Sequence, residues 1–268
     1  MANISLVIPT YRNPKYLDIC LQSAVEGRTD DSEIIVAVDG FIDESKEVLD
    51  KYKDDIKVLD LVNNQGMQMA LNLGVMNASA EHIMIINDDN VLCEGWDSIW
   101  ADVGDKEVIT INQIEPTGPG MFKFPVRDLG RTPDKFDYEG FKAYEKKISS
   151  NQVSDAGGIF PFAMKKKDYM MVGGFDTLYK SPFICDWDFF LKLELAGCDF
   201  SRTHSLHFYH FGSAATKNRG GDQDEIVFKA SEAPAADLFE YKWGIRPKLY
   251  ANNSHNPKTG NMVKGIKF

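Results

Sequence analysis

The chain up to Glu115 alternates between short apolar segments and longer segments with helical spacing, and this alternation constrains the fold more than any other feature. The apolar runs, rich in β-branched residues, predict strands at Ile4–Ile8, Glu33–Val38, Ile56–Leu61, His82–Ile86 and Val108–Asn112. The segments between them predict helices at Pro14–Val25, Asp43–Tyr52 and Met67–Ala78. Strands that alternate with helices build βαβ units. We therefore expect an α/β fold with a mostly parallel sheet and helices on both faces.

The rhythm breaks between Glu115 and Gln152, where glycine and proline residues predict loops followed by a polar helix near Tyr138–Lys147. A loop-rich insertion beside a cleft often recognises substrate. Regular structure resumes from Gly157, with a predicted helix at Trp187–Ala196 and a strand at Ser205–Phe211. The polar tail from Lys217 onward is expected to be mobile.

The composition is that of an ordinary soluble globular protein, with 43% hydrophobic residues among 268. No apolar stretch approaches the roughly 18–20 residues that span a bilayer, and the N-terminus lacks the features of a signal peptide. We therefore expect a cytoplasmic protein without a transmembrane segment. The four cysteines are scattered and form no C-x-x-C pair, which predicts buried, reduced thiols.

The net charge of −10 argues against an extensive nucleic-acid surface. The one dense basic run, Lys165-Lys166-Lys167, is either a local patch for a phosphate or acceptor, or the solvated face of a short helix. Two phosphate-binding signatures are missing. The chain has no G-x-x-x-x-G-K-[ST], and the first strand–helix turn, Pro9–Asn13, contains no glycine. A bound nucleotide would therefore need a metal ion in place of backbone amides.

Paired acids follow the apolar run Ile83–Ile86, in the sequence Asn87-Asp88-Asp89-Asn90. Carboxylates at the tip of a buried strand need a cation, a hydrogen-bonding loop or water. In open α/β sheets this tip is also where ligands bind. Two interpretations are open: a metal site that faces a phosphate-bearing ligand, or caps for a helix near Glu94–Ala101.

Six motifs occur in the order seen in a known family. They are Leu6-Val7-Ile8-Pro9-Thr10-Tyr11-Arg12, Val36-Ala37-Val38-Asp39-Gly40, Asn64-Gln65-Gly66 with Asn72-Leu73-Gly74, Asn87-Asp88-Asp89, Val172-Gly173-Gly174-Phe175-Asp176 with Cys185-Asp186-Trp187-Asp188, and His210-Phe211-Gly212-Ser213. Together they make the chain resemble a family 2 glycosyltransferase from Ile4 to Thr216. Each motif alone is weak, but the ordered set is specific.

The resemblance implies a single GT-A domain with a mostly parallel, Rossmann-like sheet and a small additional antiparallel element. Residues 1–115 would be the nucleotide-sugar-binding half, residues 116–216 the acceptor-binding and catalytic half, and residues 217–268 a C-terminal tail or lid. The implied activity is metal-dependent, inverting transfer of a sugar from a nucleotide sugar, with a UDP-sugar favoured, to an unknown hydroxyl acceptor.

The resemblance also assigns site residues. The donor would contact Pro9, Thr10, Tyr11, Arg12, Asp39, Asn64, Gly66, Asn72, Asn87 and Asp88. A Mn²⁺ or Mg²⁺ ion would bind Asp89 and His210, since hard oxygen ligands suit both ions and histidine favours manganese. For Asp39 the alternative is a turn-forming role before Gly40, and for His210 an ordinary core or surface position. Asn87 stands where the family keeps its first acid.

Asp186 is the predicted general base, with Asp188 as its competitor, because an inverting transfer needs a carboxylate to take the proton of the acceptor hydroxyl. Either acid would also suit a helix start. Leu71 replaces an arginine found in many relatives, so Lys217 and Arg219 are candidates to neutralise the diphosphate, or else belong to a solvated tail. The alternative functions are a sugar nucleotidyltransferase and a non-catalytic nucleotide-sugar-binding protein. The acceptor and the oligomeric state stay open.

Overall fold

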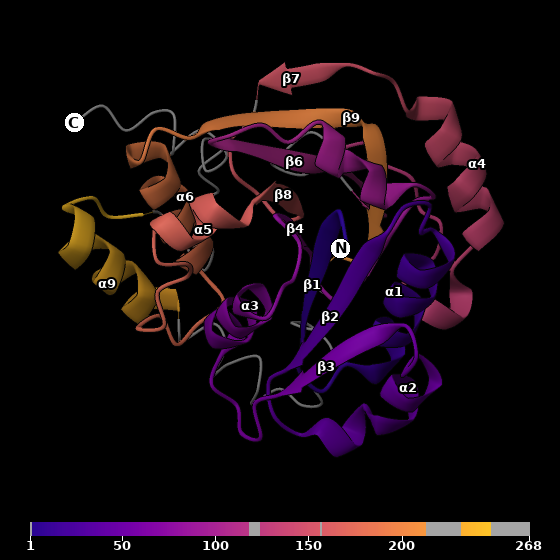
Figure 1. Ribbon diagram of the computed structural model, residues 1–268, viewed down its shortest axis with the longest axis horizontal. Helices are drawn as coiled ribbons and strands as arrows, with labels where there is room; N and C mark the ends of the chain where they lie inside the picture. The colour runs from indigo at the N-terminus through magenta and orange to yellow at the C-terminus, as the bar shows by residue number, and fades with distance from the viewer. Residues whose placement is uncertain (1, 118–123, 156, 213–231, 248–268) are drawn as a thin grey trace.

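The computed structural model describes residues 2–117, 124–155, 157–212 and 232–247, and these form a nine-stranded sheet flanked by helices (Figure 1). The strands are β1 (Ile4–Thr10), β2 (Ser32–Val38), β3 (Ile56–Asp60), β4 (His82–Ile85), β5 (Asn90–Val91), β6 (Glu107–Ile114), β7 (Val153–Asp155), β8 (Phe162–Lys165) and β9 (Asp199–His210). Across the sheet the order is β3-β2-β1-β4-β8-β6-β9-β5, and β7 pairs with β9.

Most strands of this sheet point the same way. β1 is parallel to β2 and β4, β2 is parallel to β3, and β6 is parallel to β9. β8 is antiparallel to both β4 and β6, so β4 and β6 share one direction. The carboxyl ends of β1, β2, β3, β4, β6 and β9 therefore meet at one edge, where open α/β sheets bind ligands. The expected α/β fold with a mostly parallel sheet and a small antiparallel element is confirmed.

Helices cover both faces of the sheet, which explains why its central strands β1, β2 and β4 contain continuous apolar runs rather than alternating ones. On one face Leu6 and Ile8 pack with α1 (Pro14–Glu26), α2 (Lys46–Lys51) and α4 (Tyr138–Ile148). On the other face Val7 packs with α3 (Met67–Met76), α5 (Lys166–Met171), α6 (Cys185–Leu195) and α9 (Glu232–Trp243). Figure 1 shows these two helical layers on either side of the strands.

Local sequence explains the helix starts nearest the carboxyl edge. α1 begins at Pro14, whose fixed φ suits the first turn. α3 follows Gly66, which has φ +96°, a conformation that strongly favours glycine. Within α3, a Cβ at Gly74 would lie 2.4 Å from Cγ1 of Val7, so glycine here lets the helix pack closely on β1.

Three elements differ from the sequence prediction. The segment predicted as one helix at Asp43–Tyr52 is a 3₁₀ turn, η1 (Ile42–Glu44), followed by α2. The helix expected near Glu94–Ala101 is the 3₁₀ helix η2 (Trp96–Ala101). Another 3₁₀ turn, η3 (Pro133–Lys135), precedes α4. The tail expected to be mobile contains α9, which the polar composition concealed. Its residues Ala235, Ala236 and Phe239 are buried against the sheet's second face.

Three smaller predictions concern the surface and the thiols. The four cysteines are buried and free, as expected. Lys165 lies 2.7 Å from Asp105 and 3.1 Å from Glu81, and Lys167 lies 2.7 Å from Asp105, so acidic neighbours compensate this basic run. None of the helices in the described ranges has the length and apolar character needed to cross a bilayer.

Candidate active site

A cavity of about 430 Å³ lies at the edge where the parallel strands end. Its lining comes from the ends of β1, β2, β4, β6 and β9 and from nearby loops. The lining residues are Pro9, Thr10, Tyr11, Asp39, Asn64, Gly66, Met67, Gln68, Asn87, Asp88, Asp89, Gln113, Glu115, Phe124, Ile159, Phe160, Lys180, Pro182, Phe183, Asp186 and His210. Eleven predicted site residues, from Pro9 to His210 and including Asp186, thus line one cavity.

Asp39 follows β2 and holds a loop against the cavity. Its carboxylate accepts hydrogen bonds from the backbone N–H of Gln65 (2.6 Å) and of Gly66 (3.0 Å). These bonds fix Asn64 and Gly66 in the wall. A carboxylate has about four lone-pair positions, so a role in holding this loop does not by itself prevent Asp39 from binding a ligand. The turn-forming and ligand-binding interpretations of Asp39 are therefore compatible.

Asp88 joins the end of β4 to the turn after β1. Its two oxygens accept hydrogen bonds from Thr10 Oγ1 (2.7 Å) and Asn13 Nδ2 (3.0 Å), and the residue is buried. This carboxylate thereby positions the Pro9–Tyr11 stretch of the wall. The capping interpretation fails for both acids of the pair, because the N-cap of η2 is Gly95.

Asp89 faces His210 across the cavity wall. β5 and β9 pair antiparallel with Asn90 opposite His210, and the Phe211 N–H donates to the Asp89 carbonyl (3.2 Å). This pairing places Asp89 Oδ1 3.6 Å from His210 Nε2. The two side chains are 3% and 14% exposed, so both are largely shielded from solvent.

The separation of these two atoms fits one shared divalent ion. Ligand atoms about 2.0–2.2 Å from one ion lie between about 3 Å (at right angles) and about 4.3 Å (in line) apart. The observed 3.6 Å falls within that range. Among the described residues, no group of three or more His, Cys, Asp or Glu side chains is arranged to hold a metal. Asp89 and His210 are thus the two candidate side-chain ligands among the described residues, and ligand oxygens and water could fill the remaining positions of an ion here.

Glu115, at the end of β6, is a site residue that the sequence interpretation missed. Its Oε1 lies 2.8 Å from Nδ1 of His210, on the side of the ring opposite Asp89. From the sequence, Glu115 was predicted to begin a loop-rich insertion. Its position directly after a strand parallel to β4 was the signal that could have identified it.

Asp186 lies in the first turn of α6 and lines the cavity. Burial raises the pKa of its carboxyl to about 6, although hydrogen bonding to the backbone N–H of Trp187 (3.0 Å) opposes the rise. The preceding N-cap residue, Ile184, has φ +68°, which is strained for a β-branched side chain. The fold thus holds a carboxylate of raised proton affinity at the wall.

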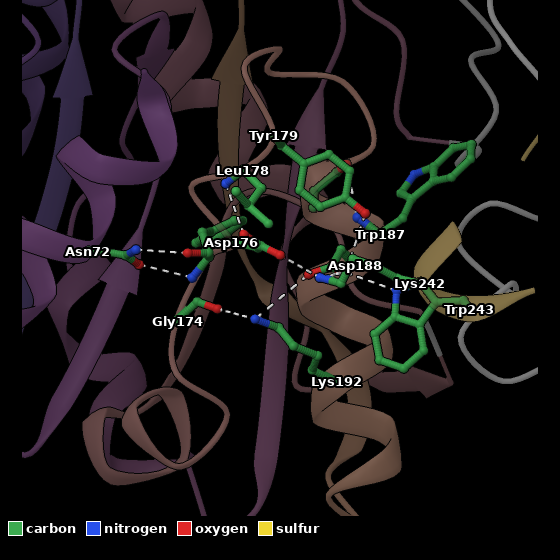
Figure 2. Close-up of polar contacts among 12 residues, drawn as sticks. Asn72, Gly174, Asp176, Leu178, Tyr179, Trp187, Asp188, Lys192, Lys242 and Trp243 are labelled. Atoms are coloured by element: carbon green, nitrogen blue, oxygen red, sulfur yellow. Dashed lines mark hydrogen bonds and ion pairs between the residues drawn. The ribbon is translucent and has the colours of Figure 1, made fainter. Parts of the chain in front are cut away.

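Asp188, the predicted competitor of Asp186, does not line the cavity, and its side chain points toward Lys242 and Trp243 (Figure 2). It is fully buried, and its Oδ1 contacts Lys242 Nζ (2.5 Å) and accepts from Trp243 Nε1 (2.9 Å), both on α9. Lys192 lies 3.7 Å from its other oxygen. Asp188 therefore anchors α9 to α6, and we do not retain it as a candidate base.

Two further predicted donor contacts lie outside the cavity lining. The Asn72 amide donates to the Phe175 carbonyl and accepts hydrogen bonds from the Phe175 N–H and the Tyr169 hydroxyl. These bonds fix the Gly173–Asp176 turn (Figure 2). The Arg12 guanidinium pairs with Glu44 and lies over the Phe41 ring. Lys217 and Arg219 fall outside the described residues.

The cavity wall carries more negative than positive charge. Five carboxylates line it, those of Asp39, Asp88, Asp89, Glu115 and Asp186. Among the described lining residues the only lysine or arginine is Lys180, which the sequence interpretation also missed. A phosphate-bearing ligand would meet net repulsion in such a site unless a cation accompanied it.

Comparisons with known proteins agree on one family. The sequence model of the protein family "Glycosyl transferase family 2" matches residues 5–149. The chain is 31% identical over 108 residues to the glycosyltransferase GlyG of Streptococcus pneumoniae serotype 4, a match that covers 39% of this chain and 36% of GlyG. The chain thus spans only about a third of that relative's length.

Solved structures share the fold at low sequence identity. TarS from S. aureus in complex with UDP has a TM-score of 0.54 and 16% identity, covering 100% of this chain and 76% of that one. The mannosyltransferase PcManGT from Pyrobaculum calidifontis, in complex with GDP-Man and Mn²⁺, has a TM-score of 0.59 and 13% identity, covering 98% and 68%.

Proposed function

The chain belongs to glycosyltransferase family 2, and from this premise we propose that it transfers a sugar from a nucleotide-diphosphate sugar to an acceptor hydroxyl, with inversion at the anomeric carbon. A UDP-sugar is the favoured donor. The observation that carries the proposal is the convergence of Asp39, Asp89 and Asp186, from three separate elements, on one cavity at the carboxyl edge of the sheet.

In this proposal the donor nucleoside lies beside Tyr11 and Asp39. Asp39 can accept a hydrogen bond from a uracil N–H while it holds the Asn64–Gly66 loop. The neighbouring Asp88 keeps the Pro9–Tyr11 stretch in position through Thr10. The UDP complex of TarS, a structural neighbour, supports a UDP donor.

Asp89 and His210 would hold a divalent ion, Mn²⁺ or Mg²⁺. When bound, such an ion neutralises the diphosphate and stabilises the charge that develops as the nucleoside diphosphate departs. The negative charge of the wall supports this role, because Lys180 is the one lysine or arginine among the described lining residues. The Mn²⁺ complex of PcManGT gives further support.

Asp186 would act as the general base. Its carboxylate accepts the proton of the acceptor hydroxyl as that oxygen attacks the anomeric carbon from the side opposite the leaving diphosphate. A pKa raised to about 6 suits this task, because the group is ionised near neutral pH yet holds a proton more strongly than an exposed aspartate.

The test is a nucleotide-release assay with a panel of nucleotide sugars. We expect slow, Mn²⁺-dependent release of UDP from a UDP-sugar by hydrolysis, and complete loss of release in EDTA. A nucleotidyltransferase would instead form pyrophosphate from UTP and a sugar phosphate. Pyrophosphate formation, or UDP release that persists in EDTA, would contradict the proposal.

A further inference from the structure

The structure assigns Glu115 as a positioning residue that fixes the tautomer and ring orientation of His210, so that Nε2 presents its lone pair toward Asp89. The activity proposed above assigns roles to Asp89 and His210 but not to Glu115. The inference deepens that proposed function and rests on it for its consequence, which is the affinity of the site for a divalent ion.

The hydrogen bond between Glu115 and His210 determines where the imidazole carries its hydrogen. Glu115 Oε1 lies 2.8 Å from His210 Nδ1. A carboxylate only accepts hydrogen bonds, so the hydrogen is on Nδ1. In a neutral ring Nε2 is then the acceptor nitrogen, and this is the atom 3.6 Å from Asp89 Oδ1.

The backbone holds Glu115 firmly enough to perform this task. Ile114, the last residue of β6, pairs with Tyr209 of β9, which places Glu115 beside His210. The Glu115 N–H donates to the Pro125 carbonyl (2.9 Å), and the Arg127 N–H donates to the Glu115 carbonyl (2.9 Å). The neighbouring strands β6, β9 and β5 thus place Glu115, His210 and Asp89 in a row.

This arrangement favours a cation between His210 and Asp89. With Nδ1 engaged by Glu115, two electron-rich atoms, His210 Nε2 and Asp89 Oδ1, face one another at 3.6 Å. A divalent ion between these two atoms would be stabilised by both of them. Carboxylates that bind the outer nitrogen of a ligating histidine orient the ring and raise its basicity, and losing one typically lowers metal affinity about 10–100-fold.

The first arm of the test measures the tautomer in the metal-free protein, independently of any activity. Long-range ¹H–¹⁵N correlation spectra distinguish a ring with hydrogen on Nδ1 from one with hydrogen on Nε2 and from a doubly protonated ring, and they are read at a pH where His210 shows the neutral pattern. We expect the Nδ1–H form for His210 in the wild type and in Glu115→Gln, whose amide oxygen can still accept. Glu115→Ala should shift His210 toward Nε2–H. A wild-type His210 in the Nε2–H form would overturn the inference.

The second arm titrates Mn²⁺ with UDP present and follows free Mn²⁺ by electron paramagnetic resonance. Glu115→Ala should weaken Mn²⁺ binding about 10–100-fold, and Glu115→Gln by less. Glu107→Gln is the matched control, since Glu107 also lies on β6 but accepts hydrogen bonds from Gly104 and Ser201 away from the cavity. The Mn²⁺ affinity of this variant should equal that of the wild type. Unchanged affinity in Glu115→Ala would overturn the inference. If neither the wild type nor any variant binds Mn²⁺, the proposed function fails. The tautomer measurement then decides the role of Glu115 by itself.

Discussion

Asp186 illustrates how surroundings give one carboxylate its chemistry. Burial raises the pKa of its carboxyl to about 6, and the ionised form is the one that can accept a proton. Ionisation is lost as the pH falls through the pKa. We therefore expect kcat/KM for sugar transfer to be level above about pH 7 and to fall about tenfold per unit below about pH 6.

The matching variant is Asp186→Asn, which should lower kcat about 10²–10⁴-fold and remove the acid limb, while UDP affinity stays close to wild type. Glu194→Gln serves as the control, because Glu194 lies on the same helix but does not line the cavity. Initial rates across the pH range check both variants. An acid limb that persists in Asp186→Asn would show that another group titrates.

Residue type alone could not separate the roles of the acids. The sequence placed Asp88 and Asp89 together at a strand end, and Asp186 and Asp188 together at a helix start. Their roles differ because neighbouring side chains differ. Asp88 accepts bonds from Thr10 and Asn13, while Asp188 is covered by residues of α9 some fifty positions later in the chain. Such partners are invisible until the chain is folded.

The element α9 contacts α6 through Asp188 (Figure 2), and α6 also carries Asp186 in its first turn. Burial lowers the pKa of Lys242, but its bonds to Asp176 (2.6 Å) and Asp188 outweigh burial and raise it. The Asp188 carboxylate is 0% exposed and so depends on this partner. α9 therefore completes the second face of the domain.

We expect Lys242→Met to lower the free energy of unfolding by about 3 kcal/mol, because it removes one partner of a buried ion pair. Arg246→Met is the control. Arg246, just beyond α9, pairs with Asp237 and Glu240 but is 47% exposed, so its loss should cost less than about 1 kcal/mol. Urea unfolding of both variants measures the difference. Equal losses would mean that the buried pair does not anchor α9.

The elements differed in how well the sequence predicted them. Strands β1, β2 and β4 were predicted within two residues at each end, because strands buried on both faces are continuous apolar runs. α9 was not predicted, because it lies in a C-terminal tail whose overall polar composition hid its packing residues Ala235, Ala236, Leu238, Phe239 and Trp243. Glu115 was assigned to a loop because β6 extends two residues beyond its predicted end at Asn112.

For the whole molecule, strand direction explains the location of the cavity. Six strands end at one edge, so residues far apart in sequence, such as Thr10 and His210, meet in one wall. The alternation of strands and helices predicted the parallel sheet. The position of β9 between β6 and β5 was not predictable from that alternation, and it is this order that brings His210 to Asp89.

The central claim is that this acidic cavity binds a nucleotide through a divalent ion held by Asp89 and His210. Calorimetric titration of UDP with and without Mn²⁺ tests it most directly. Mn²⁺ should tighten UDP binding by at least about tenfold, or about 1.4 kcal/mol, and Asp89→Asn should abolish that gain while Glu194→Gln preserves it. Equal UDP affinity with and without Mn²⁺, or a gain that survives in Asp89→Asn, would contradict the claim.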